Sequence, residues 1–135
     1  MRKLCLFAAL ILLVASNALA VEKTIFKCDF TSSLKGTQTC HAFGKICPEK
    51  NTNGECHDFL KIACEGIEIY KGALKVKEQE EWLKLAGVPN VDEPYPPYIL
   101  ARAPEELPDT VSAWLYLKES SLRGFCLFVE KPEVE

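Results

Sequence analysis

The cysteines limit the possible folds of this chain more than any other feature of its sequence does. Of the seven cysteines, six follow residue 20: Cys28, Cys40, Cys47, Cys56, Cys64 and Cys126. An even number in a chain of this size predicts three disulfides, provided that the chain folds in an oxidising compartment. Most of these cysteines lie within residues 28–64, so we expect one bridge to tie this region to Cys126 near the C-terminal end. The spacing leaves the connectivity open.

The N-terminal residues indicate the compartment. Arg2 and Lys3 precede the apolar run Leu4–Val14, and small residues follow up to Ala20. This order is typical of a secretory signal peptide, and the run is shorter than the roughly 20 residues that a transmembrane helix needs. We therefore predict a signal peptide at 1–20, no transmembrane segment, and a single secreted, extracellular, disulfide-rich domain at 21–135.

The charge balance narrows the classes of partner. Cleavage after Ala20 would leave 14 basic residues against 19 acidic ones, a net charge of −5, because Arg2 and Lys3 are removed. An acidic chain of this kind lacks the basic footprint of a nucleic-acid-binding protein and the polybasic patch of a membrane-binding one. We expect no nucleic-acid partner and no cofactor.

Each of the two histidines directly follows a cysteine, as Cys40-His41 and Cys56-His57. None of the cysteine spacings matches the close pairs that bind zinc, and disulfide formation removes the free thiolate that a catalytic cysteine needs. An alternative is that the disulfides bring both histidines together for acid–base chemistry in a small secreted hydrolase. Because no motif frames either histidine, we predict no metal site, no catalytic residues and no enzymatic activity.

Short segments of alternating hydrophobicity predict a mainly β fold. Residues 24–30 and 59–70 are rich in β-branched and aromatic residues, with Gly66 as a bulge in the second segment. Residues 111–117 alternate strictly and, with residues 124–130, predict a β-hairpin. Trp114 and Tyr116 fall on the outward face of this hairpin, so we expect a second sheet to cover them. The fold class predicted is a disulfide-tied β-sandwich.

Two segments interrupt the strand pattern. Residues 77–87 predict one short helix, because Trp82, Leu85 and Ala86 recur at helical spacing and Gly87 suits a helix C-terminus. Residues 88–109 hold six of the eight prolines. Since proline lacks an N–H donor, we expect an ordered, extended loop here. The loop is either a connector that covers the core or a preformed apolar binding rim.

Residues 105–130, EELPDTVSAWLYLKESSLRGFCLFVE, resemble the closing segment of the ML lipid-recognition family. In that family a short Leu-Pro element, here Leu107-Pro108, precedes an alternating strand, a polar turn and a last strand with a cysteine, here Cys126. The resemblance implies an immunoglobulin-like β-sandwich whose two splayed sheets hold an apolar lipid between them, with no catalysis.

These observations lead to two functional hypotheses. The first is a secreted, non-enzymatic binder of a lipid or other small apolar ligand, whose binding residues are Trp82, Tyr95, Tyr98, Ile99 and Trp114. The alternative is a secreted protein-interaction module, a protease inhibitor or an effector, that binds another extracellular protein through the proline-rich loop 88–109. In that case Tyr98 or Arg102 would serve as an anchor residue.

Overall fold

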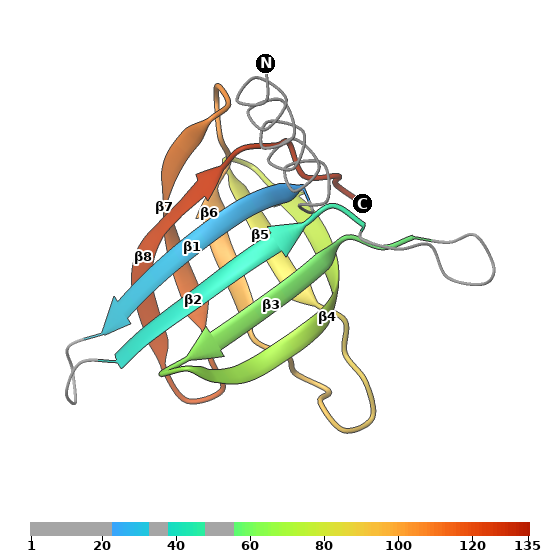
Figure 1. Cartoon of the computed structure of the whole chain (residues 1–135), viewed down its shortest axis with the longest axis vertical. Coiled ribbons are helices and arrows are strands. Elements are labelled where there is room, and N and C mark those ends of the chain that lie inside the picture. Colours follow the sequence, from blue (N-terminus) through green and yellow to red (C-terminus); the bar gives the residue numbers. More distant parts are fainter. Residues whose placement is uncertain (1–22, 33–37, 48–55) are drawn as a thin grey trace, which may run out of the picture.

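The computed structural model describes residues 23–32, 38–47 and 56–135, and these residues form eight β-strands and no helix (Figure 1). The predicted signal peptide lies outside the described residues. The strands are β1 (Thr24–Ser32), β2 (Gln38–Lys45), β3 (Phe59–Cys64), β4 (Ile67–Gln79), β5 (Trp82–Gly87), β6 (Tyr98–Arg102), β7 (Asp109–Tyr116) and β8 (Ser121–Phe128).

The sheet closes into an antiparallel barrel in which every strand pairs with its neighbours in sequence. The closing pair is β1 with β8, in register from Phe26 opposite Phe128 to Thr31 opposite Arg123. A mainly β fold is therefore confirmed, but the predicted sandwich is wrong, and so is the immunoglobulin-like sandwich implied by the ML resemblance. Closure pairs each strand on both sides and removes the sheet edges that a sandwich keeps.

Side chains along each strand alternate between the inside and the outside of the barrel. The inward-facing residues form one hydrophobic core, with Phe26, Phe30, Leu60, Ile62, Leu85, Ile99, Leu115 and Phe128 among its largest members. None of the described residues is a buried charged or polar one. The core thus lies inside the barrel, and the outer face of the sheet meets solvent.

The predicted helix at 77–87 is wrong, because these residues form the end of β4, a turn and the whole of β5. The turn is at Glu80-Glu81, where Glu80 has a left-handed φ of 57°. Leu83, Leu85 and Gly87 then alternate inward. The inward positions of these three residues follow the period of two that is typical of a strand with one buried face, and not the helical spacing of Trp82, Leu85 and Ala86.

Gly66 belongs to a turn and does not form the predicted bulge. Glu65 and Gly66 connect β3 to β4, and both have positive φ, 51° and 76°. Two such residues in a two-residue hairpin loop suit the right-handed twist of the flanking strands. The irregularity in this pair of strands lies nearby, where the register shifts between Ile62 and Ala63.

The proline-rich stretch 88–109 is not one continuous loop. It contains β6, which pairs with both β5 and β7, and it leaves a loop at 88–97 and another at 103–108. Pro97 directly precedes β6, and Pro104 follows its end by two residues. The prolines flank the strand and none lies within it, so the strand keeps all of its N–H donors.

The six cysteines among the described residues form three disulfides, as predicted. Cys28–Cys126 joins β1 to β8, and Cys40–Cys64 joins β2 to β3. Cys47–Cys56 links the segment after β2 to the segment before β3. The predicted tie between the N-terminal cysteine cluster and Cys126 is therefore confirmed, and it lies at the strand pair that closes the barrel.

The barrel has two rims, called upper and lower as Figure 1 shows them. The upper rim carries the β4–β5 turn, the 103–108 loop and the C-terminal segment 129–135. The lower rim carries the β3–β4 turn, the 88–97 loop and the β7–β8 turn. The C-terminal segment is held at the upper rim, because Val129 N–H donates to the carbonyl of Ile25 and Glu135 N–H donates to that of Val76. Pro132 is buried there.

Candidate binding surface

The five predicted ligand-binding residues do not line a common internal cavity. Ile99 faces inward and is 0% exposed. Trp82, Tyr98 and Trp114 are half-buried on the outer face of β5, β6 and β7, and Tyr95 lies in the 88–97 loop with 79% of its surface exposed. Four of the five residues are therefore on the surface, and three of these belong to adjacent strands.

The interior of the barrel is packed with its own side chains. The Phe26 ring occupies the space beside Gly44 that a Cβ atom would fill, and the Tyr70 ring does the same beside Gly87. The Tyr70 hydroxyl donates to the carbonyl of Ala73 (2.7 Å) and accepts from the N–H of Val88 (2.9 Å). An eight-stranded barrel is just wide enough for side chains to fill it, and aromatic rings take up the room that the glycines leave here.

An apolar surface runs along the outside of β5–β8, and we call it the aromatic wall. Its members are Trp82, Tyr98, Leu100, Trp114, Tyr116 and Phe125. Leu100 is in register with Trp114, and Tyr98 is in register with Tyr116. Phe125, at 63% exposed, lies diagonally across from Trp114 on β8. Neighbouring outward positions on four consecutive strands therefore carry large apolar side chains.

Contacts among these side chains hold the aromatic wall in place. The Tyr98 and Tyr116 rings stack with their centroids 4.9 Å apart. The Lys84 ammonium lies 4.5 Å from the centroid of Tyr98, and the Arg123 guanidinium lies 4.6 Å from the ring of Trp114. Both distances are within the range of cation–π attraction, so the rings of Tyr98, Tyr116 and Trp114 are each held by a cation or by another ring.

Two open grooves follow the aromatic wall. The larger, of about 680 Å³, is lined by Trp82, Trp114, Arg123 and Phe125 together with Asp29 and Thr31 of β1. The smaller, of about 420 Å³, lies between the 88–97 loop and β7 and is lined by Tyr95, Pro96, Pro97, Tyr98 and Tyr116. The loop thus extends the apolar surface to the lower rim.

A third, smaller cavity of about 210 Å³ lies at the upper rim, between the 103–108 loop and the C-terminal segment. Its apolar lining includes Leu83, Leu107 and Val134, and Glu78, Glu105 and Lys131 border it. This volume is below the range of about 300–1,000 Å³ that is usual for small-molecule sites.

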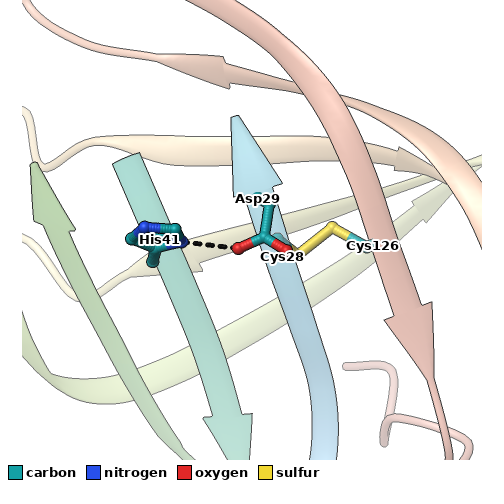
Figure 2. Close-up of a disulfide and its surroundings, with 4 residues drawn as sticks. All are labelled: Cys28, Asp29, His41 and Cys126. Carbon is teal, nitrogen blue, oxygen red and sulfur yellow. Dashed lines mark hydrogen bonds and ion pairs between the residues drawn. A yellow bond between two sulfur atoms is a disulfide. The ribbon is translucent and has the colours of Figure 1, made fainter. Parts of the chain in front are cut away.

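His41 and its neighbour Cys40 face opposite sides of the sheet. Cys40 faces inward to its disulfide with Cys64, while the His41 ring lies outside, with Nδ1 2.5 Å from Oδ1 of Asp29 on β1. Figure 2 shows this pair beside the Cys28–Cys126 disulfide. Successive side chains of a strand point in opposite directions, so the Cys-His adjacency in the sequence does not become a contact in the fold.

The two histidines are not brought together. His57 is exposed in the segment before β3, whereas His41 is in register with Ala63 near the other end of β3. Within residues 23–32, 38–47 and 56–135, no group of three or more histidine, cysteine, aspartate or glutamate side chains is arranged to hold a metal ion. The same residues contain no helix that is long and apolar enough to cross a membrane.

Three members of the aromatic wall were not among the predicted site residues: Leu100, Tyr116 and Phe125. Arg123, which contacts Trp114, was not among them either. A signal for two of them is present in the sequence. Strict alternation in residues 111–117 places Tyr116 on the same side as Trp114, and an inward Cys126 places Phe125 outward. Leu100 and Arg123 join the surface only through strand register, which the sequence does not reveal.

Comparisons with known proteins found no relative. No family model matches the chain, no curated protein matches it, and no solved structure matches it. The ML resemblance of residues 105–130 stays a prediction, but the sandwich fold that it implies is contradicted by the closed barrel.

Proposed function

We propose that this protein is a secreted, non-catalytic interaction module that binds another extracellular protein through the aromatic wall. The observation that carries the proposal is the placement of Trp82, Tyr98, Trp114, Tyr116 and Phe125 on the outside of a barrel whose interior is filled. The three disulfides fit an extracellular location.

The composition of the aromatic wall is that of a protein–protein contact. Trp, Tyr and Arg are the residue types that dominate binding energy at such interfaces, and Phe is also enriched in them. Contiguous exposed apolar patches of this kind are uncommon on monomeric proteins that have no partner. Because stacking and cation–π contacts already order the rings of Tyr98 and Trp114, their side chains lose little conformational entropy on binding.

The mode of binding differs from that of a substrate-like inhibitor loop. The backbone of β6 pairs with β5 and β7, so neither Tyr98 nor Arg102 is presented on a free loop. Arg102 also forms an ion pair with Glu81, with Nη2 2.9 Å from Oε2. The side chains of the aromatic wall therefore present a preformed surface on paired strands, which suits docking by surface complementarity better than insertion into a protease cleft.

Carriage of a lipid or small apolar ligand is the second candidate, because the volumes of the two outer grooves fall in the range of ligand pockets. The grooves are open to solvent and lie outside the barrel. An apolar ligand in them would keep much of its surface in water, so burial favours this candidate less than the first.

Two measurements separate the candidates. Native mass spectrometry of the purified protein, repeated after denaturation, is expected to give the same mass in both states. The immobilised wild type should then capture an extracellular protein that a Trp114→Ser/Phe125→Ser variant binds at least about 30-fold more weakly. The matched control is Ile67→Ser/Ile69→Ser, which removes two exposed apolar side chains from β4 and should bind as the wild type does.

Equal capture by all three forms would contradict the role of the aromatic wall. A native mass higher by a few hundred daltons, lost on denaturation, would instead favour the apolar-ligand candidate. Circular dichroism of each double variant checks that it is folded. We expect both variants to fold, because all four substituted positions lie on the outer face of the barrel.

A further inference from the structure

Lysines gather on the outer face of β1–β5, and we call this surface the basic wall. Of these strands, β1, β2 and β3 lie side by side on the near side of the barrel in Figure 1. Its members are Lys27 on β1, Lys45 on β2, Lys61 on β3, Lys71, Lys75 and Lys77 on β4, and Lys84 on β5. The outward-facing carboxylates on the same strands are Asp29 and Glu68. This surface is therefore positive, although the chain as a whole is acidic.

Acidic residues collect at the upper rim instead. Glu78, Glu80, Glu81, Glu105, Glu106, Asp109, Glu130, Glu133 and Glu135 all belong to the β4–β5 turn, the 103–108 loop or the C-terminal segment, or lie directly beside them. At physiological ionic strength the Debye length is about 8 Å, so charges on the rim are screened from much of the basic wall. The net charge of the chain therefore does not show that positive charges gather on the basic wall and negative charges at the upper rim.

Strand register sets the spacing of the lysines. Lys27, Phe43, Lys61 and Lys71 form one row across four strands, and Lys77 is in register with Lys84. Neighbouring strands are about 4.8 Å apart and the rise is about 3.3 Å per residue. The basic wall therefore extends about 20 Å along β4 and about 15 Å from β1 to β4.

Most of this charge is not neutralised within the described residues. Lys61 lies 3.9 Å from Glu68, and Asp29 is engaged by His41. None of the ion pairs between described residues includes Lys27, Lys71, Lys75 or Lys77. Lys71, Lys75 and Lys77 all lie on the outer face of β4. Their ammonium groups repel one another, which favours the binding of an external anion.

An aromatic pair orders the centre of the basic wall. The ammonium groups of Lys45 and Lys61 lie 5.0 Å and 5.7 Å from the centroid of the Phe43 ring. Phe59 packs beside Phe43 with the centroids 6.3 Å apart. Two of the cations are thus held over a fixed ring, which lowers the entropy cost of binding an anion there.

We propose that the basic wall binds a sulfated extracellular polysaccharide chain. The lysines are spread over a barrel wall, so they fit a long polyanion that lies across several strands better than one small anion. Lysine acts as a point charge, which suits a singly charged sulfate ester, whereas the two-pronged recognition of phosphate favours arginine, and the basic wall has no arginine. Lys45 and Lys61 cover the Phe43 ring, which is then not free to stack on a nucleic acid base.

The test uses a size-defined heparin oligosaccharide as the probe, with its affinity measured over a range of NaCl concentrations. The wild type should bind it at about 0.15 M NaCl and should bind the desulfated oligosaccharide much more weakly. Lys71→Gln/Lys75→Gln should lower the affinity by about tenfold or more and make it less dependent on salt. Lys71→Arg/Lys75→Arg, which keeps both charges, should retain binding.

The matched control is Lys118→Gln/Lys131→Gln, which removes the same charge from exposed positions outside the basic wall and should change the affinity by less than about twofold. Trp114→Ser/Phe125→Ser should also retain heparin binding, so this inference and the proposed function can fail separately. The inference is overturned if the wild type fails to bind heparin at that salt concentration or if the control loses as much affinity as the β4 variant. Tighter binding to duplex DNA or to phosphatidylserine vesicles overturns it as well, because the basic wall would then serve another polyanion.

Discussion

Gly124 on β8 lies directly against the backbone of Asp29 on β1, at the seam where the barrel closes. A Cβ atom added at Gly124 would overlap the carbonyl oxygen of Asp29 and would approach Cα of Phe30 to 2.8 Å. Cys28 and Cys126, joined by a disulfide, are in register on the same two strands. The seam therefore combines a covalent link with an approach that only glycine permits.

Gly124→Ala should destabilise the barrel by about 3 kcal/mol, because the backbone of β1 must move to admit the methyl group. Urea denaturation with the disulfides intact measures this cost. Gly66→Ala is the control. Gly66 has a left-handed φ of 76°, but nothing lies within 4 Å of the place where a Cβ atom would be, so the substitution should cost only about 1 kcal/mol. Equal costs for the two variants would mean that the seam relaxes easily.

Tyr70→Phe should reduce stability by about 1–3 kcal/mol, because it leaves the part-buried N–H of Val88 without its acceptor. Amide hydrogen exchange at Val88 should accelerate in the same variant. Tyr95→Phe removes a hydroxyl from an exposed ring in the adjacent loop and should leave both measurements unchanged. An unchanged exchange rate at Val88 in Tyr70→Phe would contradict the role of this hydroxyl.

Local features of the fold could be predicted from the sequence where a segment fits the periodicity of a strand and does not also fit that of a helix. The hairpin of β7 and β8 is one case, since residues 111–117 alternate without exception. Residues 82–87 are a contrary case, because Trp82, Leu85 and Ala86 fit a helix while Leu83, Leu85 and Gly87 fit a strand. Closure of the barrel depends on the pairing of β1 with β8, which are 98 residues apart at Cys28 and Cys126. No local pattern reports such a pairing.

The candidate site was predicted only in part for the same reason. Alternation places Trp114 and Tyr116 on one outward face, but only strand register places Leu100 and Trp82 beside them. The basic wall was not predicted from the sequence at all. Its lysines come from five strands, and the acidic residues, many of them at the upper rim, outweigh them in the net charge. The net charge of the sequence therefore gave the wrong impression of a uniformly acidic surface.

Removal of the Cys28–Cys126 disulfide should cost more stability than removal of Cys40–Cys64. The first closes a loop with a sequence separation of 98 and the second one of 24. In the chain-entropy model the two bridges contribute about 4.7 and about 3.4 kcal/mol. Denaturation of Cys28→Ala/Cys126→Ala and Cys40→Ala/Cys64→Ala tests this order, and the packing loss is matched because each variant removes two buried sulfur atoms. The reverse order would show that loop closure does not dominate.

Arg123 should shield Trp114 from solvent. In a Trp82→Phe background, where Trp114 is the remaining tryptophan, Arg123→Ala should increase acrylamide quenching of native fluorescence, because the guanidinium no longer covers the ring. Loss of the cation–π contact should also cost about 0.5–1 kcal/mol of stability. In the matched Trp114→Phe background the same substitution should leave quenching of Trp82 nearly unchanged. Quenching of Trp114 that does not respond to Arg123→Ala would show that the guanidinium does not rest on the indole in solution, and the aromatic wall would then be less ordered than the proposed docking surface requires.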